Sequence, residues 1–591
     1  MDNSLKPAAL FFTEARQRWL LVLLTAFTFF FLLGSRALNE PDEGRYAEIA
    51  REMIETGNWL VPHFWYLPHL DKPPMTYWLV AASMKLFGQN EWAVRLPVAL
   101  AGIGGVWATF LLGCSLGGRR VGFWSALISQ SSLLYFVMAR FLTTDIFLTQ
   151  FTVWAIYFFW RSWLELNLEF GIRNSEFFKW HLAGWAAIAL GFLTKGPIAF
   201  AIPMVSFLAL MIYRRKKIFE KKVLFGGLAI GILIFFALAA PWFLAVFRRV
   251  PQSAHFMILG QAAGHLLGTT IKNRTGSPFY FFAILLVGLL PWTILLGWLW
   301  RFESSKSKVQ NPQSAISKNG WLILNVWAIF TFVLFSFSHS KLPAYILPIF
   351  PALAVMLAWK FFRGEENSSR EGDRRGVCPT FAWQICLASA LLLPAIFPLL
   401  AKFVFHNALP DWMKWQTPVI AGIAILILWL ARKWKAQICA AFAIGLTLFG
   451  FFVTVAEIPL FETNLKANQT LKPLGAELAK NFQPGDAIVC WGKIPEGLPF
   501  YSGAAISATN RPYFGGMNLT QVPFEFPGNR ERLGHLLLPD ENALAQLVQS
   551  KKRVWIVGFD GMIEKFQKKY GASPLHLVTR SGQWELFLNR R

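Results

Sequence analysis

The sequence has few charged residues for its length. Of its 591 residues, 15% are Asp, Glu, Lys or Arg, whereas soluble domains carry about 25%. This scarcity argues against a water-soluble multidomain protein. The five cysteines are too few and too scattered for a small disulfide-stapled fold. Disorder is excluded because 27 Trp and 57 Phe are present and disordered chains are poor in aromatic residues.

Long apolar runs dominate the chain. Hydrophobic residues make up 55% of it, and a membrane helix needs roughly 20 mainly apolar residues in succession. We therefore predict a mainly α-helical, polytopic membrane protein with about thirteen spans. They lie at 19–34, 92–116, 121–138, 144–160, 180–193, 198–212, 223–246, 279–300, 321–337, 342–359, 381–401, 416–431 and 436–457. The fifth and sixth runs are split by Lys195-Gly196-Pro197, which predicts a tight helical hairpin.

The net charge of +24 does not indicate a nucleic-acid partner. Lys and Arg occur in short runs between the apolar segments, such as residues 214–217 and 432–435, and not on one long basic face. This pattern follows the positive-inside rule of membrane proteins. It predicts a cytoplasmic N-terminus. With an odd number of spans, the C-terminal segment lies on the outer side of the membrane.

The last part of the chain has a different pattern. Residues 1–459 form the predicted membrane domain, and residues 460–591 a small soluble α/β domain. Periodicity and capping residues place helices and strands in the second segment. Helices are expected at 471–481 and 542–550, and strands at 487–491, 554–557 and 584–588. Cys490 is its only cysteine, so no disulfide forms within it.

Unusual polar residues occur in the connections predicted to face outward. They are Asp42, Glu43, Arg45, Tyr46, Asp71, Lys72, Arg140, Asp145, Lys195, His255, His265, Lys341 and Tyr345. Ionisable groups at membrane depth are costly and usually mark function, although any single one could be a solvated loop charge. The set offers carboxylates for base or metal chemistry and cations for a phosphate group. No P-loop, G-x-S-x-G or H-E-x-x-H motif is present, so a nucleotide donor is not indicated.

The adjacent acids Asp42 and Glu43 have two interpretations. They follow Pro41 and precede the helical stretch 44–56, so they could simply stabilise a helix dipole. Adjacent carboxylates on a helix point in different directions, so one could face a site while the other makes a structural bond. Two helical stretches within the outer loop 35–91, at 46–59 and 76–87, are amphipathic and could lie in the membrane interface.

Residues 41–53, Pro-Asp-Glu-Gly-Arg-Tyr-Ala-Glu-Ile-Ala-Arg-Glu-Met, resemble the first outer loop of bacterial lipid-linked-sugar glycosyltransferases. This superfamily has the GT-C fold and includes lipid A aminoarabinose transferases and protein O-mannosyltransferases. Further matching motifs bring the resemblance to roughly residues 20–360. They are Gly57–Pro62, Asp71–Pro74, Thr143–Asp145, Leu193–Gly196 and Lys341–Pro348.

The resemblance implies roles for individual residues. It makes Asp42 the central catalytic carboxylate and Asp145 the second-loop acid, and we add Glu43 as a catalytic candidate. Lys72 and Lys195 would hold the polyprenyl phosphate of the donor. Further donor-binding candidates are Arg45, Tyr46, Arg140, Lys341, Tyr345 and His265. The aminoarabinose enzymes have Glu where this chain has Asp71, which leaves a divalent metal ion at Asp71 and His255 an open question.

The residues and the resemblance together predict a membrane glycosyltransferase, hexosyl or pentosyl. The resemblance implies a location in the bacterial inner membrane, with the C-terminal domain in the periplasm, and inversion of the sugar's anomeric centre. The donor would be a sugar on a polyprenyl-phosphate carrier, and the acceptor lipid A or another envelope glycolipid. Protein O-mannosylation of an exported protein is the alternative within enzymes. A lipid or polysaccharide transporter would have polar residues near the bilayer midplane and internal repeats, and the sequence has neither feature. A structural partner in an envelope complex would tolerate changes at Asp42 and Asp145.

Overall fold

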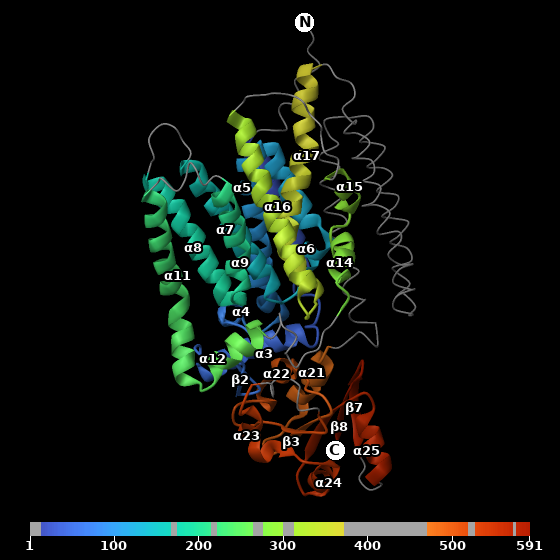
Figure 1. Ribbon diagram of the computed structural model, residues 1–591. Helices are drawn as coiled ribbons and strands as arrows, with labels where there is room; N and C mark the ends of the chain where they lie inside the picture. Colours follow the sequence, from blue (N-terminus) through green and yellow to red (C-terminus); the bar gives the residue numbers. More distant parts are fainter. Residues whose placement is uncertain are drawn as a thin grey trace, which may run out of the picture.

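The computed structural model describes residues 14–166, 174–213, 222–263, 276–299, 312–371, 470–517, 526–570 and 575–590. Its helices form a tall bundle, and the C-terminal residues form a unit below the bundle (Figure 1). Three predicted spans, at 381–401, 416–431 and 436–457, lie outside the described residues.

The bundle is built from helices at the predicted apolar runs. They are α2 (Glu14–Phe30), α5 (Glu91–Ser131), α6 (Leu133–Met138), α7 (Asp145–Leu166), α8 (Asn174–Lys195), α9 (Ile198–Tyr213), α11 (Lys222–Arg249), α14 (Tyr280–Gly288), η2 (Trp292–Leu295), α15 (Leu296–Leu299), α16 (Pro312–Phe337), η3 (Pro343–Ile349) and α17 (Phe350–Glu371). Four described helical segments are long and apolar enough to cross a membrane. These are Glu91–Ser131, Val223–Arg249, Lys318–Phe337 and Pro343–Lys360. The protein is therefore a mainly helical, multi-pass membrane protein.

Glycines set two of the sharp connections. The second and third predicted spans are joined in α5, which is kinked at Gly118 with φ 83° and ψ 179°. α8 ends at Lys195 and α9 begins at Ile198, so Gly196 and Pro197 alone separate them. Gly196 has φ 71°, a left-handed conformation that glycine adopts without steric cost. The predicted tight hairpin is confirmed.

The long connection after α2 forms a compact layer at one end of the bundle. It contains α3 (Asp42–Thr56), the short hairpin β1–β2 (His63–Phe64 and Leu67–Pro68) and α4 (Met75–Phe87). Every residue of α3 from Glu43 to Met53 is buried. The polar side chains between Glu43 and Met53 therefore meet protein partners and not water.

The C-terminal unit contains a six-stranded sheet in the order β5-β4-β3-β6-β8-β7. Its first four strands are parallel, and β8 and β7 are antiparallel additions. The strands are β3 (Ala487–Trp491), β4 (Tyr513–Gly515), β5 (Leu537–Leu538), β6 (Val554–Phe559), β7 (His576–Ser581) and β8 (Trp584–Leu588). The described helices of the unit are α21 (Lys472–Asn481), α22 (Leu498–Ser502), α23 (Asn529–Leu533), α24 (Glu541–Gln549) and α25 (Met562–Tyr570).

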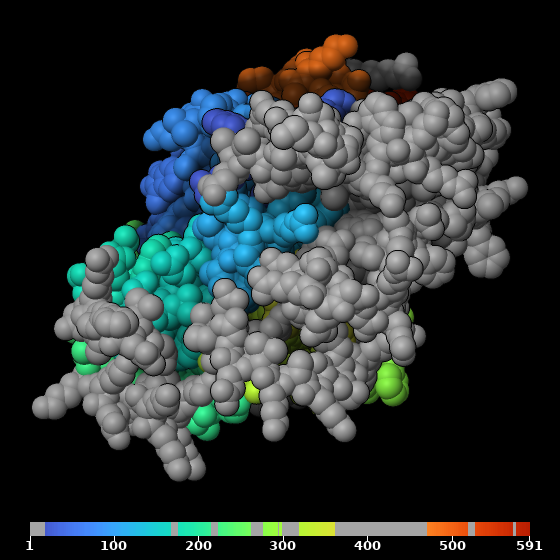
Figure 2. Space-filling view, turned by 90° about the horizontal axis from the view of Figure 1, so that it is seen from above, coloured from blue at the N-terminus to red at the C-terminus, as the bar shows by residue number. Residues whose placement is uncertain are grey.

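The C-terminal unit docks directly against the layer that contains α3. The backbone N–H of Leu38 donates to the Tyr501 hydroxyl at 2.7 Å, and Lys472 pairs with Glu91 at 2.6 Å. A Cβ added to Gly44 would lie 2.8 Å from the Cα of Gly497, so only glycine fits this contact. Seen from above, orange residues of the unit emerge at one edge of the molecule (Figure 2). The loop after β3 thus reaches the first turn of α3.

Candidate active site

The first turn of α3 carries an aspartate–arginine pair. Asp42 is the first residue of the helix, and Arg45, one turn later, donates to Asp42 Oδ1. The Asp42 side chain is 36% exposed, so the carboxylate is accessible to a substrate. Arg45 Nε also lies 3.2 Å from Glu496 Oε2. Burial would lower the pKa of Arg45, but Glu496 and Asp42 outweigh it and raise that pKa above the usual range. The guanidinium therefore stays charged.

Tyr46 connects this turn to the start of α7. Its ring stacks on Tyr77 with centroids 5.4 Å apart, and its hydroxyl hydrogen-bonds the Thr144 side chain. Burial raises the pKa of Tyr46, so the phenol is neutral at physiological pH. Asp145, the next residue after Thr144, lies near enough to add to this shift.

A second charged pair lies where α7 begins and α8 ends. Asp145 is the first residue of α7 and Lys195 the last residue of α8, and the two side chains form an ion pair. They are only 7% and 10% exposed. The Lys195 ammonium lies 4.3 Å from the ring centroid of Tyr345, within the range of a cation–π contact. An ammonium has three N–H donors, so Lys195 can bind Asp145 and an incoming phosphate together.

Lys72 directly follows Asp71, which interacts with Arg45 of the first pair. It precedes Pro73 and Pro74 at the start of α4, and its ammonium donates to the Asp71 carbonyl oxygen at 3.1 Å. The Asp71 carboxylate is close enough to act on Arg45. The structure therefore brings together seven of the predicted site residues. They are Asp42, Arg45, Tyr46, Asp71, Asp145, Lys195 and Tyr345.

Glu43 points away from this group and into the protein. Its carboxylate accepts hydrogen bonds from Arg36 at 2.6 Å and from Arg95 at 2.9 Å. It also accepts from the backbone N–H of Leu142 at 3.2 Å. Burial would raise the pKa of Glu43, but Arg36 and Arg95 outweigh it and hold that pKa well below its usual range. Glu43 is thus a buried anion held by two arginines and not an exposed helix-end charge.

Arg140 and Lys341 are occupied by backbone carbonyls. Arg140 donates to the carbonyl oxygens of Thr28 and Phe29 at 3.2 and 3.1 Å. The Lys341 ammonium donates to the carbonyl oxygens of Ser336 and Ser338 at 2.7 and 3.0 Å. Cations near helix C-termini commonly bind such carbonyls. These hydrogen bonds tie the two cations to the ends of α2 and α16.

The predicted metal ligands do not converge. Among the described residues, no three His, Cys, Asp or Glu side chains come close enough to hold a metal ion. Asp71 lies beside Arg45, whereas His255 lies in α12 (Ser253–His255). Asp71 and His255 therefore belong to no such group among the described residues. His265, a predicted donor-binding residue, lies outside the described residues.

Three charged residues at the site, Glu40, Lys493 and Glu496, were not predicted from the sequence. Lys493 and Glu496 follow β3. Glu496 pairs with Arg45, and Lys493 lies near enough to Glu40 and Glu496 to interact with both. The buried Glu40 carboxylate accepts from the Gly497 N–H at 2.9 Å. Burial, with the nearby Glu496, raises the pKa of Glu40. Sites often lie at the carboxyl ends of parallel strands, and the charged stretch 492–497 after β3 carried that signal.

Comparisons with known proteins extend over most of the chain. A family model described as "Dolichyl-phosphate-mannose-protein mannosyltransferase" matches residues 71–248. The "Undecaprenyl phosphate-alpha-4-amino-4-deoxy-L-arabinose arabinosyl transferase" of Aeromonas salmonicida is 30% identical over 495 residues, covering 80% of this chain and 84% of the relative. The Erwinia tasmaniensis protein of the same description is 33% identical over 350 residues. That alignment covers 58% of this chain and spans 59% of the relative's length.

A crystal structure of ArnT from Cupriavidus metallidurans bound to undecaprenyl phosphate has the same fold. The match has a TM-score of 0.77 and covers 98% of this chain and 99% of that chain. The sequence identity is 23%, so the likeness concerns the fold.

Proposed function

The chain belongs to the undecaprenyl phosphate-α-4-amino-4-deoxy-L-arabinose arabinosyl transferase family, and we propose that it is an inner-membrane glycosyltransferase of the GT-C fold. It transfers a sugar, a pentose in this proposal, from an undecaprenyl-phosphate carrier to lipid A or a related envelope glycolipid. The observation that carries the proposal is a group of two charged pairs: Asp42 with Arg45 at the start of α3, and Asp145 with Lys195 at the ends of the apolar helices α7 and α8. A donor's hydrocarbon tail can stay in the bilayer beside this group.

The donor phosphate is the leaving group in this reaction. The bond between the anomeric carbon and the phosphate oxygen breaks, and its electron pair stays on the phosphate. Lys195 would stabilise that charge, since it is held by Asp145 and Tyr345 and keeps further N–H donors. Lys72 would approach the phosphate from the Asp71 side.

Asp42 would act on the opposite side of the sugar. Arg45 binds one of its oxygens, and the partly exposed carboxylate can support positive charge on the sugar or accept the proton of an acceptor hydroxyl. An acceptor phosphate needs no base, in which case only the first role applies. Attack opposite the leaving phosphate would invert the anomeric centre, as the family resemblance implies.

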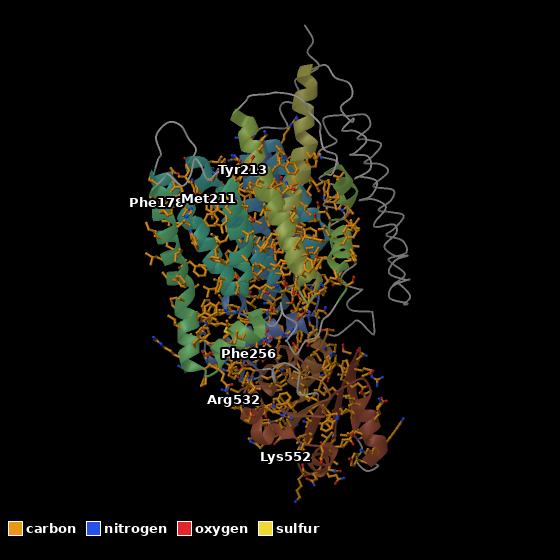
Figure 3. The ribbon with its side chains drawn as sticks, in the orientation of Figure 1. Phe178, Met211, Tyr213, Phe256, Arg532 and Lys552 are labelled. Carbon is orange, nitrogen blue, oxygen red and sulfur yellow. The ribbon has the colours of Figure 1, made fainter. Side chains whose placement is uncertain are left out.

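The thirteen-span arrangement and a periplasmic α/β domain at 460–591 are part of the proposal. Tyr213, at the start of the basic run 214–217, lies at the end of the bundle opposite Lys552 of the C-terminal unit (Figure 3). Basic loops favour the cytoplasm, which supports a periplasmic C-terminal unit independently of the number of spans. The layer at 35–91 then lies at the outer membrane–water boundary.

This topology predicts the location of two reporters. Green fluorescent protein and alkaline phosphatase are fused in turn at each position and assayed in cells. After Tyr213 only green fluorescent protein, the cytoplasmic reporter, should be active, and after Arg591 only alkaline phosphatase, the exported reporter. Reporters active on the same side would contradict the proposed orientation.

Transfer of a labelled aminopentose from undecaprenyl phosphate to lipid A by the purified protein in detergent tests the function. The wild-type protein should form labelled lipid A. Lys195→Met should raise the KM for the donor about tenfold or more, because it removes a charge-assisted hydrogen bond to the phosphate. The matched control is Lys179→Met, which changes an exposed lysine of the same helix and should transfer normally. No product with any lipid acceptor would contradict the proposal.

Protein O-mannosylation is the second candidate function, and the match of residues 71–248 to a mannosyltransferase family model favours it. The same assay decides between the two functions when mannosyl-phosphoryl-undecaprenol and an exported protein replace the aminopentose donor and lipid A. Labelled protein without labelled lipid would support mannosylation.

A further inference from the structure

An open pocket lies at the far end of α3 from Asp42. Its volume is about 570 Å³, within the range of ligand-binding pockets. It is lined by Thr56, Gly57, Asn58, Trp59, Leu60, His63, Tyr66 and Arg249. Most of these residues come from the segment 56–66 at the end of α3 and after it. This segment contains the Gly57–Pro62 motif, which is not part of the donor site.

Hydrogen bonds hold the pocket wall in place. The Asn58 side chain accepts from the backbone N–H groups of Leu60 and Val61 at 3.2 and 3.1 Å. Two indole N–H groups bind carbonyl oxygens of the same loop: Trp78 binds Trp59, and Trp242 binds Leu60, at 2.7 and 2.8 Å. The loop is therefore preformed and does not need a ligand to order it.

The charges at this pocket are positive. Arg249 lines it, and in the described part of the chain this side chain forms no ion pair. Arg249 and Arg532 both lower the pKa of His63, after the larger effect of burial, so both cations lie near its ring. The nearby acid Glu55 does not line the pocket and pairs at 2.7 Å with Arg51, which also pairs with Glu48. The pocket thus suits an anionic group.

Apolar surface leads from the membrane to this pocket. Arg249 ends α11, whose Leu233, Phe236 and Leu244 are 67%, 57% and 53% exposed. Phe256 and Arg532 lie close together where the bundle meets the C-terminal unit (Figure 3), and both approach the ring of Phe526. A lipid with its acyl chains along α11 can place its head group at Arg249.

We propose that this pocket binds a phosphate-bearing sugar of the acceptor glycolipid, at a point remote from the reacting group. The 15 residues of α3 separate the pocket from Asp42 by roughly 20 Å at 1.5 Å per residue. A single phosphate cannot occupy both places, so the ligand is a head group of several sugars with more than one anionic group. Arg249 binds the distal phosphate, and Trp59 offers an aromatic face to a sugar ring. The inference rests on the proposed function.

Acceptor kinetics test the pocket with two probes: diphosphoryl lipid A, and a monophosphoryl form that keeps the accepting group. Arg249→Met should raise the KM for diphosphoryl lipid A about tenfold, since a charge-assisted hydrogen bond is lost. Its kcat and its KM for the donor should not change. With the monophosphoryl probe, wild type and Arg249→Met should differ less than twofold. Arg248→Met is the matched control, because Arg248 is its neighbour at the same helix end but does not line the pocket.

Binding is measured separately, by native mass spectrometry in an Asp42→Asn background. Diphosphoryl lipid A should bind, phosphatidylglycerol should not displace it, and Arg249→Met should weaken it. Equal losses in Arg248→Met and Arg249→Met, or displacement by phosphatidylglycerol, would overturn the pocket assignment. An unchanged KM in Arg249→Met would do the same. Arg249-dependent binding by a wild-type protein that transfers no sugar would instead refute the proposed function alone.

Discussion

Asp42→Asn should lower the turnover number by about 10²–10⁴-fold, the loss typical of a missing acid–base or charge-stabilising group. Asparagine keeps the size of the side chain, and its carbonyl oxygen can still accept the hydrogen bond of Arg45. The position of Arg45 is therefore kept, and the loss reports the missing charge. The KM for the donor should change much less, because the carboxylate acts mainly in the transition state. Transfer of labelled sugar at several donor concentrations measures the turnover number and the KM.

Glu496→Gln is the comparison for Asp42→Asn. It removes the other carboxylate that pairs with Arg45 and leaves Asp42 intact. We expect a loss limited to about tenfold, because one charge-assisted contact to Arg45 weakens while Asp42 keeps its charge. An Asp42→Asn protein that is folded and turns over like wild type would remove Asp42 from the chemistry.

The reacting end of the site was predictable because several of its residues occupy unusual places in the sequence. Asp145 and Lys195 are ionisable residues at the ends of strongly apolar runs, where an unpaired charge is costly. The structure pairs them across two helices. The contact between Glu40 and Gly497, 457 residues apart, was not predictable. It depends on how the C-terminal unit docks, which local patterns do not encode.

Arg140 and Lys341 have partners that residue type alone does not predict. Both are cations in outward connections, as a phosphate site requires. Their partners are backbone carbonyls of Thr28, Phe29, Ser336 and Ser338. Because every residue has a carbonyl, nothing in the sequence marks these partners. Only the arrangement of helix ends distinguishes a lysine that binds a helix terminus from one that can bind a ligand.

The strands of the C-terminal unit were also predictable only in part. Strands β3, β6 and β8 were predicted from short apolar runs. Every residue of β3 and β8 is buried, and so are the first five residues of β6. Strands β4 and β5 have three and two residues, too few for a recognisable alternation. Edge strand β7 is mostly exposed, so it lacks the apolar run that marked the others.

The choice between Asp42 and Glu43 also needed the structure. Both are acids at one helix N-terminus, and the sequence leaves either free to be catalytic. The decisive partner of Glu43, Arg95, lies 52 residues further along the chain. Arg95 also donates to the carbonyl oxygens of Arg36 and Ala37 at 2.6 and 2.9 Å. Glu43 is therefore the centre of a network that joins α3 to α5 and to the chain after α2.

Glu43→Gln should destabilise the protein by about 3–5 kcal/mol, the usual cost of removing one partner of a buried ion pair. The glutamine leaves Arg36 and Arg95 buried without a counter-charge. A helix-dipole role would cost only about 0.3–1 kcal/mol. Thermal unfolding in detergent measures the difference, with Glu176→Gln as the control, since Glu176 is an acid in the first turn of α8 and is 37% exposed. A stable Glu43→Gln protein without activity would instead make Glu43 catalytic.

The same network fixes the acid sensitivity of the wild-type protein. The pKa of Glu43 is lower in the folded protein than its usual value of 4.5, because Arg36 and Arg95 outweigh the effect of burial. The unfolded state therefore binds the proton more readily, and the stabilisation is complete above about pH 4.5. It is lost as the pH falls from there toward the lower pKa of the folded state. Glu43→Gln should lose this part of the acid dependence, so its unfolding temperature should fall less steeply than that of wild type below pH 4.5.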